Sequence, residues 1–140
     1  MRKLLLITLI MLFAISGVAF SAPESSVNTI FDDVTIDTTA TASSSVITVK
    51  SSGYFGVWYQ ATSSVGTPDI KLEVTMSPDT TTANFVEPEG MPDIVTNLAD
   101  ETAHVKGISP PPMKYMKIKY TGNGANPADT ILNLKLFRQE

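Results

Sequence analysis

The sequence predicts an all-β fold, namely a single antiparallel β-sandwich of jelly-roll-like form. β-Branched residues alternate with polar ones through most of the chain, and helical periodicity is nearly absent. Turn residues separate the apolar runs at intervals of roughly 8 to 12 residues, which is typical of sandwiches and barrels. We therefore expect one sandwich domain over residues 34–140.

The first residues have the pattern of a signal peptide. The basic pair Arg2-Lys3 precedes an apolar run over residues 4–15, and small residues in Ala19-Phe20-Ser21 predict cleavage after position 21. The run is shorter than the roughly 20 residues of a spanning helix, so we expect no membrane span after removal of residues 1–21. An uncleaved anchor is the alternative. The mature protein is expected to be secreted, extracellular or periplasmic.

Composition narrows the choice of partners. Residues 22–33 are polar and are expected to form a flexible N-terminal arm. Cleavage after residue 21 leaves eight basic against fourteen acidic residues, a net charge of −6. Phosphate binding needs clustered Lys and Arg, so nucleic acid is not an expected partner. The chain has no cysteine, so its stability must come from packing, from sheet hydrogen bonds, or from association with other chains.

The expected strands follow from alternation. In the clearest one, alternate residues from Ile70 to Met76 are apolar, whereas Lys71, Glu73 and Thr75 are expected to face solvent. The basic residues Lys114, Lys117 and Lys119 are likewise read as the wet face of a strand. Further strands are expected at Val46–Lys50, Tyr54–Thr62, Met116–Tyr120 and Leu132–Leu136.

A Thr/Val-rich segment, Val27–Thr41, has two interpretations. It can add as a strand to an exposed sheet edge of a neighbouring molecule, with Val34 and Ile36 as the assembly residues. It can also be an ordinary first strand of its own sheet, which is favoured because strands close in sequence usually pair.

The aromatic centre of the sequence is GYFGVWYQA, residues 53–61. Alternation places Phe55 and Tyr59 on one face and Tyr54, Trp58 and Gln60 on the other. The favoured interpretation is a central strand whose aromatic rings supply core area. In the alternative, Tyr54, Trp58 and Gln60 form an exposed platform that stacks on a glycan or contacts another protein.

The loop FVEPEGMPDI, residues 85–94, carries the candidate metal ligands Glu87, Glu89 and Asp93. Calcium takes six to eight oxygen ligands, and an acidic loop bent by Gly and Pro can offer several. The spacing does not match an EF-hand. A solvated connecting loop is the favoured interpretation, so we expect no cofactor, with calcium as the exception to test.

No catalytic pattern emerges, and the chain is not expected to be an enzyme. The single histidine, His104, cannot build a multi-histidine zinc site, and no G-x-S-x-G elbow is present. A small hydrolase would have to depend on Glu87 or His104, because paired carboxylates or a histidine base are the groups such chemistry uses.

The C-terminal two thirds of the chain resemble small β-sandwich accessory and structural proteins of phages and prophages. The resemblance lies in the order GYFGVWYQAT, IKLEVTMSPD, FVEPEG and YMKIKYTGNGANPADTILNLKLFRQ. It includes the strand Met116–Lys119, the Gly/Asn-rich turn Gly122–Pro127 and the final strand Ile131–Gln139. The resemblance implies a structural or binding role without catalytic residues. The signal peptide sets this chain apart as an exported form.

These observations predict a non-enzymatic exported module. It is either a self-assembling subunit of a surface layer or filament, or an accessory that binds another surface protein. The alternative is a carbohydrate-binding module that uses Tyr54 and Trp58, and in that case glycan should change the emission of Trp58, the only tryptophan.

Overall fold

The computed structural model describes residues 25–49 and 54–139. The predicted signal peptide, residues 1–21, lies outside these ranges. The described residues form these elements: β1 Ser25–Ile36, β2 Thr41–Ser43, β3 Ile47–Thr48, β4 Phe55–Thr62, β5 Ile70–Ser77, the 3-10 helix η1 Thr82–Asn84, β6 Val95–Leu98, β7 His104–Ile108, β8 Tyr115–Gly122 and β9 Thr130–Gln139. No helix among them is long and apolar enough to cross a membrane.

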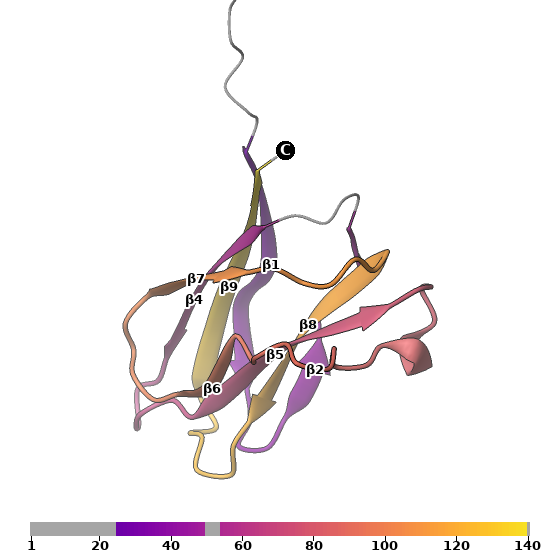
Figure 1. Ribbon diagram of the computed structural model, residues 1–140. Helices are drawn as coiled ribbons and strands as arrows, with labels where there is room; N and C mark the ends of the chain where they lie inside the picture. The colour runs from indigo at the N-terminus through magenta and orange to yellow at the C-terminus, as the bar shows by residue number, and fades with distance from the viewer. Residues whose placement is uncertain (1–24, 50–53, 140) are drawn as a thin grey trace, which may run out of the picture.

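The strands form two antiparallel sheets that pack face to face (Figure 1). Sheet A has the order β1-β9-β4-β7, and sheet B has the order β2-β8-β5-β6, with β3 also paired to β8. The pairs nest along the chain, because β1 joins β9, β2 joins β8, β4 joins β7 and β5 joins β6. This nesting is the jelly-roll arrangement, so the predicted fold class is confirmed.

The core lies between the two sheets. β4 alternates buried and half-buried residues along its whole length, as period-two alternation predicts. The rings of Phe31 on β1 and Tyr120 on β8 meet edge to face at 5.3 Å between centroids and so join the two sheets. The fully buried side chains of the core include Phe55, Ile36, Leu72, Met116, Ile118, Leu132 and Leu134.

The expected arm at residues 22–33 differs from the structure, because residues 25–33 belong to β1. This strand pairs with β9 from Ser25 opposite Gln139 to Ile36 opposite Thr130. Irregularities on either side of Phe31 interrupt its alternation, and Asp33 takes a left-handed φ of 48°. These bulges, together with polar residues on a sheet edge, explain why the sequence resembled a flexible arm.

The two predicted assembly residues lie in the core of their own chain. Ile36 is fully buried, and Val34 packs against the core opposite Leu132 of β9. The Val27–Thr41 segment thus contributes the first strand of its own sheet, as the favoured interpretation predicted, but this strand pairs with the last strand, β9, and not with a strand close in sequence. The predicted strand Val46–Lys50 is shorter in the structure, where β3 spans Ile47–Thr48, and Lys50 lies outside the described residues.

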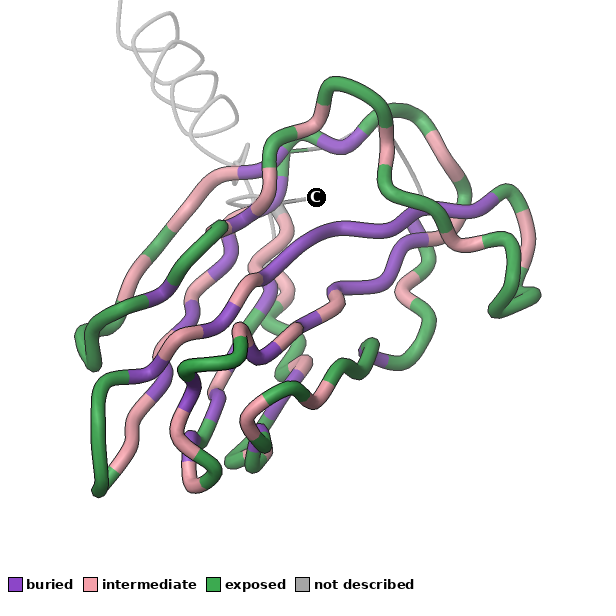
Figure 2. The backbone as a smooth tube through the Cα atoms, turned by 90° about the horizontal axis from the view of Figure 1, so that it is seen from below, coloured by how far each residue is buried: buried purple, intermediate pink, exposed green. Residues whose placement is uncertain are grey.

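The prediction that the outer side chains of sheet B face solvent is wrong for Glu73, Thr75 and Lys117, which are all buried. The segment 78–94, between β5 and β6, folds back over this face. The ring of Phe85 lies 4.5 Å from Lys117 Nζ, and Val86 makes an isolated bridge to the end of β5. The run of buried residues from 72 to 77 is consequently the longest purple stretch in Figure 2. Local alternation cannot reveal such a cover.

A buried asparagine fixes the turn that leads from β8 to β9. Asn126 is 1% exposed, and its Oδ1 accepts hydrogen bonds from the Asp69 amide and the Thr130 hydroxyl, both at 3.0 Å. Its Nδ2 donates to the carbonyl of Ile36. Because a buried amide must be satisfied, this side chain ties three loop regions together at one end of the sandwich.

The same turn supplies a stability prediction. A Cβ at Gly122 would lie 2.7 Å from the carbonyl oxygen of Asp37 and 2.8 Å from that of Thr38, whereas a Cβ at Gly124 would meet no atom within 4 Å. We expect Gly122→Ala to lower the free energy of unfolding by about 1–3 kcal/mol through overpacking. Gly124→Ala is the matched control and should leave it nearly unchanged. Urea unfolding measures both, and equal stability of the two variants would contradict the tight contact.

Candidate functional site

The outer face of sheet A carries a row of apolar side chains, here called the aromatic face. Trp58 on β4 lies between Val105 on β7 and Lys135 on β9. Two residues before Trp58 on β4, Gly56 lies between Gly107 on β7 and Phe137 on β9. Tyr54 precedes this strand and covers Gly107, where an added Cβ would lie 1.6 Å from the tyrosine hydroxyl oxygen. The face comprises Tyr54, Trp58, Val105 and Phe137, bordered by Lys135.

Much of this face is open to solvent. Tyr54 is 70% exposed and Val105 is 74% exposed. Trp58 is half-buried, with Lys135 Nζ 5.5 Å from the centre of its ring. Exposed Val27 continues the row onto β1, because it lies opposite Phe137. Grouped apolar residues of this kind mark interaction surfaces more often than scattered ones do.

The structure therefore refines the prediction for the aromatic centre. Phe55 and Tyr59 are buried in the core, while Tyr54, Trp58 and Gln60 share the outer face. The Gln60 side-chain amide donates to the carbonyl of Glu101 at 3.0 Å. Gln60 thus holds the β6–β7 loop, and Tyr54 and Trp58 present the accessible rings.

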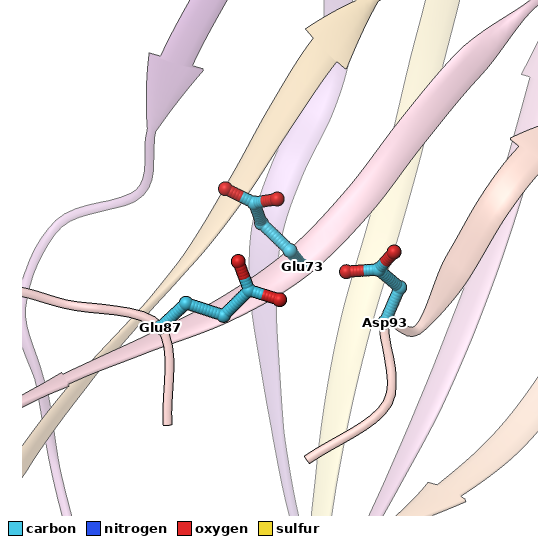
Figure 3. A group of neighbouring side chains, drawn as sticks. All are labelled: Glu73, Glu87 and Asp93. Carbon is cyan, nitrogen blue, oxygen red and sulfur yellow. The ribbon is translucent and has the colours of Figure 1, made fainter. Parts of the chain in front are cut away.

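A polar site lies on sheet B beneath the covering segment 78–94. Figure 3 shows its three carboxylates. Glu73 on β5 meets Glu87 and Asp93 from the segment 78–94, and one carboxylate oxygen of each lies within 4.8 Å of the others. Of the predicted ligands, Glu87 and Asp93 come together and Glu89 is not part of the group. Sequence reasoning missed Glu73, which looked like an ordinary wet-face residue of its strand.

Two lysines neutralise part of this cluster. Lys119 Nζ lies 2.5 Å from Glu73 Oε1, and Lys71 contacts Glu73 Oε2 and lies 3.2 Å from Asp93 Oδ1. Burial raises the pKa of Glu73, but hydrogen bonds from Lys119 and Lys71 outweigh it and hold the pKa below the usual 4.5. Because these ammonium groups already lie against the carboxylates, calcium would have to displace them, and the residues fit this ion poorly. Calcium binding stays a prediction.

His104 lies in a small polar group at the start of β7. Its Nε2 is 2.8 Å from Asp100 Oδ1 and 3.1 Å from the Thr102 hydroxyl. Hydrogen bonds from the Thr102 side chain and from His104 lower the Asp100 pKa to about 2. In a catalytic triad the acid and the nucleophile contact opposite ring nitrogens, whereas here both contact the same one. This group is therefore a turn-stabilising network without the geometry of a triad.

Comparisons with known proteins place the fold. No protein-family model matches the chain, and no curated protein matches it. A solved structure of infectious bursal disease virus, Gx strain, contains a chain that superposes with a TM-score of 0.54 at 11% identity. The match covers 83% of this chain and 32% of the viral chain, so this chain spans about a third of that length. A chain of the Gt strain matches at a TM-score of 0.45 and 14% identity, with 84% and 32% covered.

The first of these likenesses shows a viral-type β fold at an identity too low to show more. It agrees with the fold expected from the phage-like resemblance.

The Glu73 network predicts a pH-dependent stability. Glu73→Gln should lower the free energy of unfolding by about 2 kcal/mol at neutral pH, because charge-assisted hydrogen bonds from two lysines are lost. The Glu73 pKa is depressed in the folded protein, so this contribution is present above about 4.5 and fades as the pH falls through the folded pKa. Urea unfolding across an acid series measures it.

The control is Glu89→Gln, because Glu89 is exposed and lies outside the carboxylate group. Its stability should follow that of the natural protein at every pH. A Glu73→Gln deficit that stayed constant in strong acid would contradict the assigned charge network.

Proposed function

We propose that this chain is a non-enzymatic structural module that associates with further copies of itself through the aromatic face of sheet A. The observation that carries the proposal is the exposure of Tyr54 and Val105 beside Trp58 in one continuous row. Sheet B is covered by the segment 78–94, whereas sheet A presents its outer face to solvent. An exported surface or filament subunit is the form that we propose for the mature protein.

Burial of the apolar side chains of the aromatic face would favour association. Burying a side chain of the size of Val105 or Tyr54 contributes roughly 1.5–3 kcal/mol. In a dimer that uses the same face of both copies, each copy would bury its own Val105 and its own Tyr54. Gly107 has no side chain, which leaves room for the Tyr54 ring to lie over β7 on this face. Association also has an entropic cost, so several such residues must be buried together. The row extends over β1, β9, β4 and β7, so a contact on this face would involve several apolar side chains at once.

The comparisons support a structural role in a general way. The fold is shared with a chain of a virus, and the sequence resembles phage-type structural proteins. The predicted signal peptide is the basis for proposing export. Neither polar group described above has an arrangement that favours catalysis, since Glu73 is held by two lysines and His104 lacks triad geometry.

Association through this face makes a direct prediction. Val105→Lys should weaken self-association on the order of tenfold or more, because a charge would be desolvated within the contact. Val65→Lys is the matched control, since Val65 is 76% exposed but lies in the β4–β5 loop, outside the aromatic face. Light scattering coupled to size exclusion over a wide concentration range measures both. A natural protein that stays monomeric throughout would count against the proposal.

Carbohydrate binding is the second candidate for the same face, because Tyr54 and Trp58 present their rings at and along β4 on the outer face of sheet A. Glycan addition should then shift or quench the emission of Trp58, and Tyr54→Ala should weaken binding about tenfold while keeping the reporter. Tyr115→Ala on sheet B is the control. An unchanged spectrum across a broad panel of polysaccharides would remove this candidate.

A further inference from the structure

We propose that Asn123 is a site of slow deamidation, at which the side-chain amide loses ammonia and becomes a carboxylate beside Asp69. The new charge would loosen the turn that carries the chain from β8 to β9 at one end of the sandwich. The proposal concerns this turn alone and does not depend on how the aromatic face is used.

The residue after Asn123 makes the reaction accessible. Asn123 precedes Gly124 in the one Asn-Gly pair of the sequence, whereas the other asparagines precede Thr, Phe, Leu or Pro. Deamidation begins when the backbone nitrogen of the following residue attacks the side-chain carbon of the asparagine. The two atoms lie a few bonds apart on the same stretch of chain, so local rotation closes the ring between them. Glycine has no Cβ to obstruct the approach and leaves the backbone free to adopt the ring geometry.

The structure leaves the attacking nitrogen available. Gly124 and Ala125 are exposed at the tip of a turn, which the Asn126 amide closes by donating to the Asn123 carbonyl at 3.0 Å. The Gly124 amide donates to no acceptor among the residues that the structure describes. A Cβ at this position would meet no atom within 4 Å. Solvent therefore reaches the amide proton, and the tip has space to move.

The side chain of Asn123 is held by Asp69. Its Nδ2 donates to Asp69 Oδ1 at 2.8 Å, and the Asn123 backbone amide donates to the Asp69 carbonyl at 2.9 Å. The first of these bonds restrains rotation of the side chain. A hydrogen bond of this kind changes an equilibrium by a factor on the order of ten, so it delays the reaction without preventing it.

The reaction uses water as its co-reactant. The Gly124 nitrogen gives its proton to hydroxide and attacks Asn123 Cγ, and a C–N bond forms. The bond from Cγ to Nδ2 then breaks, and ammonia leaves with a proton taken from water. A second water opens the cyclic imide at either of its two carbonyls. Opening at one carbonyl gives aspartate, and opening at the other leaves the backbone passing through Cγ as isoaspartate.

The product carboxylate is poorly accommodated in the turn. An anionic oxygen would replace the amide donor opposite Asp69 Oδ1, and like charges this close repel each other. No ion pair among the described residues includes Asp69, so no paired cation offsets the repulsion. Gly122 and Asn126 on either side are buried, which limits relief by movement of the flanks. Asp69 also donates its amide to Asn126, so the strain reaches the contact that fixes the crossing between the sheets.

Peptide mapping of the purified full-length chain, kept folded at mildly alkaline pH, tests the proposal. We expect the peptide that contains Asn123 to be replaced over time by two separable products of equal mass, the aspartate and isoaspartate forms. Each should be heavier by the mass difference between a hydroxyl and an amino group. Gly124→Ala adds a Cβ beside the attacking nitrogen and should slow the change at least several-fold without loss of the fold.

Two further variants test the effect of the new charge. Asn123→Asp should lower the midpoint of urea unfolding, because two carboxylates then face each other. Combining Asn123→Asp with Asp69→Asn exchanges the donor and the acceptor, so a hydrogen bond returns and the midpoint should recover.

Three results would overturn the proposal. In the first, the folded chain keeps Asn123 intact under conditions in which the urea-unfolded chain loses ammonia there. In the second, Gly124→Ala changes as fast as the natural chain. In the third, Asn123→Asp unfolds at the midpoint of the natural chain.

Discussion

The placement of β8 and β9 is the constraint on which the rest of the structure depends. These strands follow one another in the chain, yet each lies in the middle of a different sheet, β8 between β2 and β5 and β9 between β1 and β4. The turn between them must therefore cross from one sheet to the other, and the satisfied amide of Asn126 makes that crossing possible. Both sheets are complete only when the C-terminal strands are in place, so long-range pairing dominates this fold.

The two outer faces of the sandwich differ because of one segment. Residues 78–94 cover sheet B, which buries β5 on both sides and encloses Glu73 with Lys71 and Lys119. Sheet A has no such cover over Tyr54 and Val105, which remain exposed. The contrast gives each face a separate physical character. Sheet B has an internal ionic network, and sheet A has an apolar surface that gains free energy when a partner removes it from water.

Charge and burial together decide what the polar groups can do. Glu73 keeps its charge in a nearly closed site because two ammonium groups compensate it, and unpaired burial of such a group would be strongly unfavourable. Asp100 is exposed, and its low pKa comes from hydrogen bonds within one turn. The first group connects segments distant in sequence, whereas the second only shapes the approach to β7. A perturbed pKa by itself therefore does not distinguish a functional site from a turn that is stabilised by hydrogen bonds.

The sequence by itself determined the fold class, most strand positions and the inward faces of β4, β5, β8 and β9, because period-two alternation reports directly which residues can be buried together. It also placed Tyr54 and Trp58 on the face opposite Phe55. Only the tertiary structure decided that residues 25–33 form an edge strand, since bulges around Phe31 break the alternation. Only the tertiary structure brought Glu73 to Glu87 and Asp93, because the path of a covering loop is set by packing against a distant strand and leaves no local pattern.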